Sequence, residues 1–302
     1  MKKAPFIFSV YSLKGGSAKT STAVNLAASF AASGYKILYV DMDPQSHGAQ
    51  RFGMSKQQIA ERSIAQAMQK RAPFDSMVFH SKSDNINVIA GGSALRDLVR
   101  LHETDKHRAY LLAPVLKSDC LLKYDIALID TDGKTGPLIE SALAVSHGYI
   151  APCPPEKDPI NDLGETIHLA NQMTDVINPG LDLLGVVITR YDSKLSVHKE
   201  YYRQLSEAAA QGNIRVFKSV IPLSNAVPNS GSLNQTLLQY QASLIRKVGL
   251  PVTIAHLELA HEIEKLMPAY TDQLPLALRN NERERKNPIP VLDLTNVGSA
   301  TK

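Results

Sequence analysis

The stretch that decides the fold is SLKGGSAKTS, residues 12–21, which joins an apolar segment to a run with helical periodicity. FIFSVYS (6–12) leads into it and TSTAVNLAASFAASG (20–34) continues from it. A glycine pair between a strand and a helix lets the backbone wrap a polyphosphate, and the free N–H groups at the helix start attract its charge. The sequence therefore predicts a phosphate-binding loop, in which Lys19 reaches the phosphates and the Thr20 hydroxyl coordinates magnesium.

Composition places the chain among ordinary globular proteins. Its 302 residues, 44% of them hydrophobic and 21% charged, are enough to bury the core of one large α/β domain or two small ones. The net charge of +4 permits a local basic face but not the blanket positive charge of a histone-like protein. Cys120 and Cys153 lie far apart and match neither a disulfide framework nor a zinc site, so we expect a reducing cytoplasm. The sequence contains no window that approaches the roughly 20 apolar residues of a membrane span.

Apolar segments of strand length alternate with longer segments of helical periodicity. The expected strands are 6–12, 35–43, 86–90, 124–132, 148–153, 183–192 and 216–222. The expected helices are 20–33, 56–70, 93–116, 136–146, 159–177, 196–211, 232–248 and 252–267. Strands that are apolar on both faces belong in a parallel sheet covered by helices on both sides. We therefore predict an α/β fold with a mostly parallel twisted sheet, formed by residues 1–273, followed by a polar, mobile tail at 274–302.

The phosphate loop departs from the strict pattern G-x-x-x-x-G-K-[ST], because Leu13 and Ala18 occupy the positions of its outer glycines. KGGSAKT matches the deviant Walker A loop instead, K-G-G-x-x-K-[ST]. Its companions occur in order: AVNLA (23–27), DMDPQ (41–45), LIDTD (128–132), LLGVVITRYDSK (183–194) and VFKSVIP (216–222). The ordered set, over roughly residues 5–270, resembles the ParA family of partition ATPases, within the larger group that includes MinD.

The resemblance implies how ATP is held. The residues expected to bind it are Gly15, Gly16, Ser17, Ala18, Lys19, Thr20 and Ser21. In this family the first lysine of the loop, Lys14 here, reaches from one subunit to the phosphates bound by the other, so that two chains sandwich two ATP molecules. Such an ammonium offsets the charge that builds on the phosphoryl oxygens, as an arginine finger does.

The resemblance also assigns the acidic residues at the strand ends. Asp43 is expected to orient the attacking water, and Asp41 and Asp130 to hold the magnesium shell together with Thr20. For Asp41 and Asp43 the alternative is capping of a strand end. The second switch, DTDGKTG (130–136), has Asp132 where the family usually has proline. This carboxylate could add a second acid near the metal or face solvent, and we expect the latter.

Loops after the late strands are expected to hold the adenine base, because ligands of open α/β sheets lie beyond the strand C-termini. The resemblance nominates Arg190 and Pro222 as neighbours of the base, although a proline at this position also suits the end of a strand.

Basic residues concentrate between Arg190 and Lys218. ATPases of this family bind DNA without sequence preference, which needs only phosphate contacts. The candidate DNA-binding residues are Lys194, Lys199, Arg203, Arg246 and Lys247. Leu223 stands where the family often has arginine, and a solvated helix face is the alternative explanation of the patch. The resemblance further implies slow, Mg²⁺-dependent ATP hydrolysis, stimulated by a ParB-like centromere-binding adaptor, and an association with the nucleoid.

A related soluble ATPase that positions another cargo, such as a protein complex or an organelle-like body, would carry the same motifs and stays an open alternative. A MinD-like regulator on a membrane is disfavoured, because Pro275, Pro288 and Pro290 interrupt the tail. A tyrosine kinase with the same loop is disfavoured because no tyrosine follows Tyr270.

Overall fold

The computed structural model describes residues 4–69, 72–83, 85–117, 119–156, 158–244 and 249–279. Seven strands form one sheet in the order β3-β4-β2-β5-β1-β6-β7. They are β1 (Phe6–Val10), β2 (Ile37–Asp41), β3 (Phe79–His80), β4 (Ile86–Ile89), β5 (Ile126–Asp130), β6 (Gly148–Cys153) and β7 (Asp182–Ile188). The pairings are parallel except that between β3 and β4, which confirms the predicted mostly parallel sheet.

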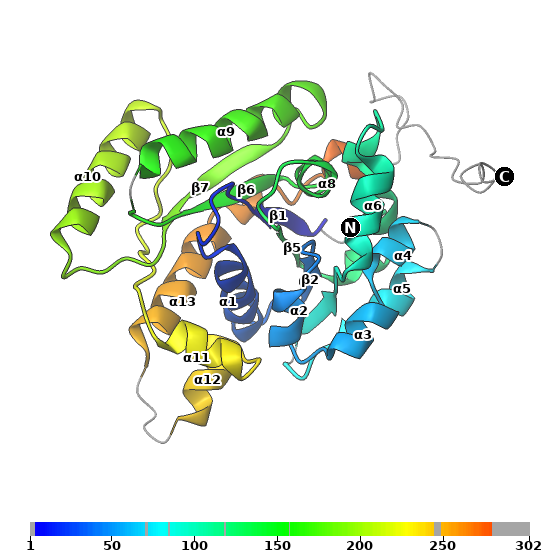
Figure 1. Ribbon diagram of the computed structural model, residues 1–302, viewed down its shortest axis with the longest axis horizontal. Helices are drawn as coiled ribbons and strands as arrows, with labels where there is room; N and C mark the ends of the chain where they lie inside the picture. Colours follow the sequence, from blue (N-terminus) through cyan, green and yellow to red (C-terminus); the bar gives the residue numbers. More distant parts are fainter. Residues whose placement is uncertain are drawn as a thin grey trace.

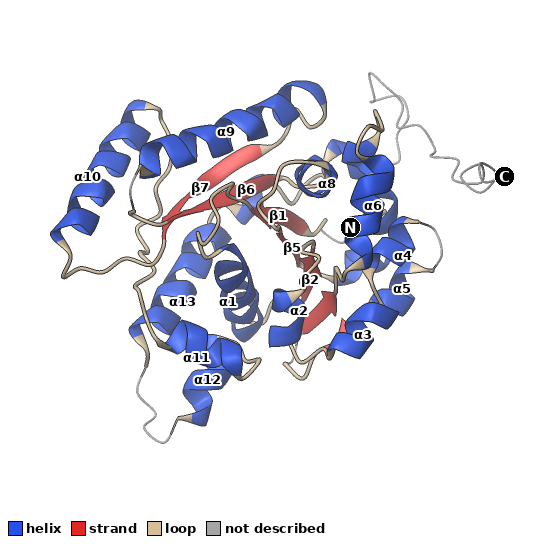
Figure 2. Cartoon of the chain, in the orientation of Figure 1, coloured by secondary structure: helices blue, strands red, loops and turns tan. Residues whose placement is uncertain are grey.

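Helices cover both faces of this sheet (Figures 1 and 2). They are α1 (Lys19–Ala32), α2 (His47–Arg51), α3 (Lys56–Glu61), α4 (Ile64–Met68), α5 (Phe74–Met77), α6 (Ala94–His102), α7 (Ala113–Leu116), α8 (Pro137–Ala144), α9 (Pro159–Val176), α10 (Ser196–Gln211), α11 (Ala226–Ser232), α12 (Leu237–Ser243) and α13 (Pro251–Glu264). Short 3₁₀ turns lie at Arg108–Tyr110, Asp119–Lys123, Met267–Ala269 and Leu276–Leu278.

Successive side chains of β1 point to opposite faces of the sheet and enter the two apolar layers that cover it. Phe6 and Phe8 point into a core shared with α1 and α13, whereas Ile7 points to the opposite core, which α4, α6 and α8 cover. A third apolar cluster joins α9 and α10 to β6 and β7. Burial on both faces explains why these strands read as continuous apolar runs.

Four predicted elements differ from the structure. The predicted helix 56–70 divides into α3 and α4 at Ser63, whose hydroxyl caps α4 by accepting from the Ala65 N–H. The predicted helix 232–248 is wrong at its start, because α11 ends at Ser232 and Thr236 begins α12 with a capping box. The predicted strand 216–222 forms only isolated bridges, from Val216 to Val186 in β7 and from Pro222 to Tyr191 beyond the end of β7.

The predicted helix 93–116 is also broken. It separates into α6, a 3₁₀ turn and α7, and a proline lies in the first turn of α7. The predicted tail begins too early. Ala277 and Leu278 are each only 3% exposed and pack in the core with α4 and α7, so residues 274–279 belong to the folded domain. The rest of the predicted tail, 280–302, lies outside the described residues.

The sheet register places the acidic strand ends beside the phosphate loop. Asp130 pairs with Asp41 on one side and with Val10 on the other. Because β1, β2 and β5 are parallel and adjacent, their carboxyl ends meet at one edge, where residues 11–18 leave β1.

Candidate nucleotide site

The phosphate loop turns back on itself before α1 begins. Gly16 (φ 76°) and Ala18 (φ 69°) both adopt the left-handed conformation, which glycine tolerates and which alanine takes up at a cost. The Thr189 hydroxyl donates to the Ser17 carbonyl over 3.0 Å and ties the loop to the end of β7. The Lys19 ammonium donates to the Lys14 carbonyl oxygen over 3.0 Å, so it lies beneath the loop.

Lys19 is 8% exposed and is surrounded by acidic groups. Burial lowers the pKa of its ammonium, and the negative charges of Asp130, Asp132 and Asp43 oppose that effect. The sequence-predicted residues Lys19, Asp43 and Asp130 are therefore brought together at one place. A cation held there favours the binding of phosphate oxygens.

Asp130, at the end of β5, is fully buried. One of its oxygens, Oδ2, accepts a hydrogen bond of 2.8 Å from the Tyr39 hydroxyl, and Oδ1 has no partner among the described residues. Burial raises the pKa of Asp130 to about 7, although the hydroxyls of Tyr39 and Thr20 favour the charged form. An unpartnered carboxylate oxygen beside the Thr20 hydroxyl is the donor chemistry that suits Mg²⁺.

Asp41 has a different environment from the predicted one. Its Oδ1 accepts from the Asp43 N–H over 3.0 Å, and its Oδ2 accepts from the Ala49 N–H over 2.8 Å. One oxygen therefore holds the loop that follows β2, and the other holds α2 itself. These contacts favour the capping alternative for Asp41 over the predicted metal role, which leaves Thr20 and Asp130 as the metal candidates.

Asp43 and Asp132 face the phosphate loop from two segments. Asp43 is half-buried, and its Oδ1 accepts from the Gln45 N–H over 2.8 Å. Asp132 is also half-buried, with its Oδ1 accepting from the Lys134 N–H over 3.1 Å, so the expectation that it faces solvent is wrong. Its charge acts on both Lys19 and Asp43, and burial raises its own pKa.

The glycine after Asp132 lies against the phosphate loop. Gly133 has a φ of +77°, and a Cβ there would overlap the Lys19 ammonium and lie 2.8 Å from the Ser12 carbonyl oxygen. The backbone of this segment therefore passes directly over the phosphate loop, in a conformation that favours glycine.

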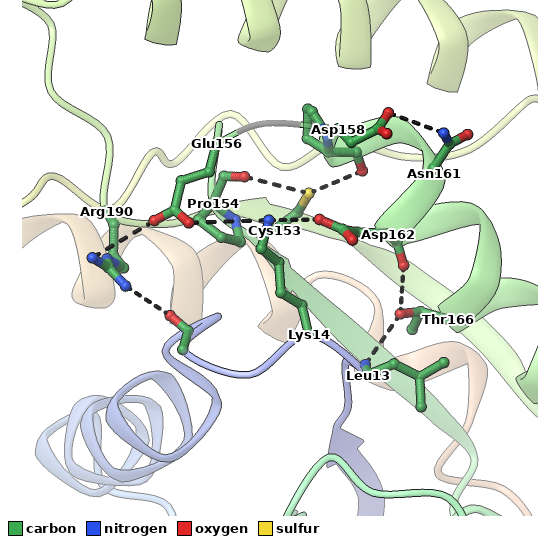
Figure 3. A network of polar contacts seen from close by, with 12 residues as sticks. Leu13, Lys14, Cys153, Pro154, Glu156, Asp158, Asn161, Asp162, Thr166 and Arg190 are labelled. Atoms are coloured by element: carbon green, nitrogen blue, oxygen red, sulfur yellow. Dashed lines mark hydrogen bonds and ion pairs between the residues drawn. The ribbon is translucent and has the colours of Figure 1, made fainter.

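Lys14, the first lysine of the loop, is held within its own chain by an acidic cluster (Figure 3). Its ammonium lies 2.6 Å from Asp162, in α9, and 4.0 Å from Glu156. Glu156 also lies 3.6 Å from Arg190, whose guanidinium donates to the Gly16 carbonyl. The cluster thus links α9 to the phosphate loop at Lys14 and Gly16.

A pocket of 380 Å³ lies between the phosphate loop and the segment 221–228. Its lining includes Gly16 and Ala18 from the loop and the two predicted neighbours of adenine, Arg190 and Pro222. The structure therefore brings these two residues to the same pocket as the phosphate loop. His256, in α13, also lines it.

The predicted DNA-binding residues are only partly available for contact. Lys194 and Lys199 are exposed. Arg203 is exposed but pairs with Glu200 at 2.7 Å and with Glu207 at 2.6 Å, so two carboxylates offset its charge. Arg246 and Lys247 lie outside the described residues.

Two findings limit other kinds of site. Within the described ranges, no group of three or more His, Cys, Asp or Glu side chains is arranged to hold a metal. The described part of the chain also contains no helix of the length and apolar character needed to span a bilayer.

Sequence reasoning missed Tyr39, Asp162 and His256. Tyr39 is one more aromatic residue in a buried strand, and Asp162 lies 148 residues from the lysine it binds. His256 resembles any histidine of an amphipathic helix. The only available signal was the position of Asp162 just inside the helix that follows β6, which does not identify a partner.

Comparison with known proteins identifies the family of the chain. A family model described as an AAA domain matches residues 6–183. The chromosome-partitioning ATPase Soj of Thermus thermophilus is 29% identical over 227 residues, which cover 75% of this chain and 85% of Soj. The chromosome partitioning protein ParA of Caulobacter vibrioides is 25% identical over 259 residues, covering 85% of this chain and 93% of that protein.

A solved structure shows the same fold. Cobyrinic acid a,c-diamide synthase of Mycobacterium smegmatis, with a bound ATP analogue and magnesium, has a TM-score of 0.73 at 20% identity, covering 88% of this chain and 97% of that one. The family match spans more than half of the chain, which therefore belongs to this AAA-domain family and is a ParA-type ATPase of the ParA/MinD superfamily.

Proposed function

We propose that the protein hydrolyses ATP slowly with Mg²⁺, pairs as an ATP-dependent sandwich dimer, binds DNA without sequence preference and segregates plasmid or chromosomal DNA. Its expected partner is a ParB-like centromere-binding adaptor that stimulates hydrolysis. The proposal rests on the two lysines of the phosphate loop. The Lys19 ammonium lies beneath the loop among carboxylates, and the Lys14 ammonium forms an ion pair with Asp162.

The side chains have distinct tasks in this proposal. The N–H groups of the loop and the Lys19 ammonium bind the phosphates, and Asp43 orients the attacking water. Thr20 and Asp130 would hold magnesium, directly or through water, and the ion offsets negative charge on the phosphate oxygens when bound. The unpartnered Oδ1 of Asp130 is the observation that favours this assignment.

Lys14 couples nucleotide state to pairing. In the single chain its ammonium is neutralised by Asp162, so reaching the phosphates of a partner subunit requires that this ion pair be exchanged. The γ-phosphate of ATP offers more negative charge for that exchange than ADP does. Pairing is therefore expected to depend on ATP.

The DNA-binding step is supported by exposed lysines and by the relatives. Lys194 and Lys199 are exposed in each chain, and a dimer doubles the number of phosphate contacts. Both relatives described above are named as chromosome-partitioning proteins. Nucleoid association follows from the same contacts.

The proposal is tested by DNA binding with ATP, ADP and no nucleotide over a series of salt concentrations. We expect tight binding with ATP alone, falling with salt, and its loss in Lys14→Ala. Lys199→Ala should weaken binding more than its matched control Arg203→Ala, because Glu200 and Glu207 already offset the Arg203 charge. Affinity that depends on neither nucleotide nor salt would contradict the partition function and favour an ATPase that positions another cargo.

A further inference from the structure

His256 is the one described histidine that lines the pocket beside the phosphate loop. It is 1% exposed and lies in the second turn of α13. The pocket has the size of a small-molecule site, and Gly16 and Ala18 belong to both the loop and the pocket lining. A nucleotide with its phosphates on the loop would therefore place its base toward this pocket.

The hydrogen bonding of His256 fixes where its proton lies. Its Nδ1 is 2.7 Å from the Val252 carbonyl oxygen, one turn earlier in α13. A carbonyl oxygen only accepts hydrogen bonds, so Nδ1 carries the proton and donates it. The other ring nitrogen, Nε2, is buried and has no partner among the described residues.

Burial decides the charge of the ring. It lowers the pKa of His256 to about 4, so the imidazole is neutral near pH 7. A neutral imidazole with its proton on Nδ1 has a lone pair on Nε2 and acts there only as an acceptor. A buried acceptor without a partner is costly, and such a group in a native structure calls for a ligand or another explanation.

We propose that Nε2 of His256 accepts a hydrogen bond from the exocyclic amine of adenine, and that His256 thereby selects adenine nucleotides over 6-oxo purine nucleotides. This rests on the proposed function, which places ATP on the phosphate loop. Adenine carries an amine, a donor, at position 6, whereas hypoxanthine and guanine carry a carbonyl oxygen there. An acceptor facing an acceptor leaves both groups unpaired, and sites of this kind discriminate strongly.

Apolar groups in the pocket support a base rather than a charged ligand. Pro222, Val227 and Pro228 line the wall opposite the phosphate loop, and flat apolar walls suit a purine ring. Arg190, also in the lining, already donates to Gly16 and pairs with Glu156. Its guanidinium is thus directed toward the loop and the acidic cluster.

The test measures dissociation constants of three nucleoside diphosphates with Mg²⁺, since diphosphates avoid hydrolysis. They are ADP, purine riboside diphosphate, which lacks a group at position 6, and inosine diphosphate, which has an oxygen there. For the wild type we expect ADP to bind about 10-fold tighter than purine riboside diphosphate and about 100-fold tighter than inosine diphosphate. In His256→Leu the three constants should fall within about 3-fold of one another.

His261→Leu is the matched control, because His261 lies in the same helix with 65% of its side chain exposed and outside the pocket lining. It should retain the wild-type ratios. Equal affinity of the wild type for ADP and purine riboside diphosphate would overturn the inference, even if His256→Leu failed to fold. Unchanged ratios in a folded His256→Leu would overturn it as well. A wild type that binds ADP without this selectivity contradicts the role of His256 alone, whereas one that binds no adenine nucleotide contradicts the proposed function too.

Discussion

A few buried charges determine the chemistry of the site. The Lys19 ammonium faces the carboxylates of Asp43, Asp130 and Asp132, and each group changes the electrostatic environment of the others. Asp41 adds a fourth carboxylate, but backbone N–H groups engage both of its oxygens. Substitution of a buried member of this charged group therefore changes nucleotide binding, hydrolysis and stability together. Asp43 is an exception, because it is only half-buried and its side chain is held by one local hydrogen bond, from Gln45.

Asp43→Ala tests the predicted role in hydrolysis. We expect ATP hydrolysis to fall by about 100-fold or more, since general-base and positioning effects are typically of that size. The dissociation constant for ATP and the melting temperature should change little, because within the described part of the chain Asp43 forms hydrogen bonds only to neighbours between residues 41 and 46. Single-turnover hydrolysis beside equilibrium binding separates the two effects. Full activity in this variant would contradict the assignment.

His256 makes stability depend on pH. Its folded pKa of about 4 lies below the ordinary value of 6.5, so between those values the unfolded state binds more protons than the folded state. Stability is therefore fully present above pH 6.5 and falls as the pH drops toward 4, by about 3 kcal/mol for this group. Urea unfolding at a series of pH values measures the slope.

The control for this prediction is the difference between two leucine variants. His256→Leu should flatten the fall in stability between pH 6.5 and 4, because the titrating group is gone. His261→Leu should keep the wild-type slope, since His261 is exposed. Identical slopes in the wild type and His256→Leu would show that burial of His256 does not control the pH dependence.

The sequence predicts the residues whose roles depend on local pattern. Lys19, Thr20 and Asp130 follow from a glycine pair, a helix start and a strand end. It fails where partners come from distant segments: the binding of Lys14 by Asp162 and the half-burial of Asp132 depend on how α9 and the second switch pack. Neither the Lys14–Asp162 contact nor the half-burial of Asp132 follows from the sequence pattern.

Among the elements, β2 and α2 form a unit through Tyr39. Its hydroxyl donates to Asp130, and α2 packs so closely that a Cβ at Gly48 would overlap that hydroxyl. Gly48→Ala should therefore displace Tyr39, leaving Asp130 with fewer partners. We expect a loss of about 1–3 kcal/mol in the free energy of unfolding, as for other overpacked sites, and reduced hydrolysis. Wild-type stability by urea unfolding would contradict this packing.

At Gly164, in α9, we expect substitution by alanine to stabilise the protein instead. Gly164 is exposed, and a Cβ there would meet no atom within 4 Å. Gly164→Ala should raise the free energy of unfolding by about 0.5–1 kcal/mol, because alanine has the higher helix propensity. Thermal and urea unfolding measure the gain, and a decrease would mean that α9 is not a regular exposed helix at this position.

Helices and strands whose apolar residues follow one clear periodicity are predicted best. Helix α10 and strand β6 match their predicted ranges, 196–211 and 148–153. The sequence does not predict where a long helical pattern is interrupted and a new helix begins. At Ser63 and Thr236 the side chain caps the new helix, and this local hydrogen bond competes with continuation of the helical periodicity. The segment 216–222 has a strand-like composition, yet it forms only bridges beside β7.

At the scale of the whole molecule, the phosphate loop, the pocket between it and residues 221–228, and Lys14 all belong to one edge of the sheet. A second chain brought to that edge by ATP would align two such sites and double the exposed lysines. In the proposed function, ATP favours this pair and hydrolysis to ADP releases it, so the exposed surface would depend on which nucleotide is bound. This coupling is the central claim.

The most direct test is the mass in solution of Asp43→Ala, in which hydrolysis is slow, with saturating ATP and Mg²⁺, by light scattering. The claim predicts twice the chain mass of 33.0 kDa with ATP, a single chain with ADP, and a single chain with ATP once Lys14→Ala is added. A single chain at saturating ATP, or a pair that persists without the Lys14 ammonium, would contradict it.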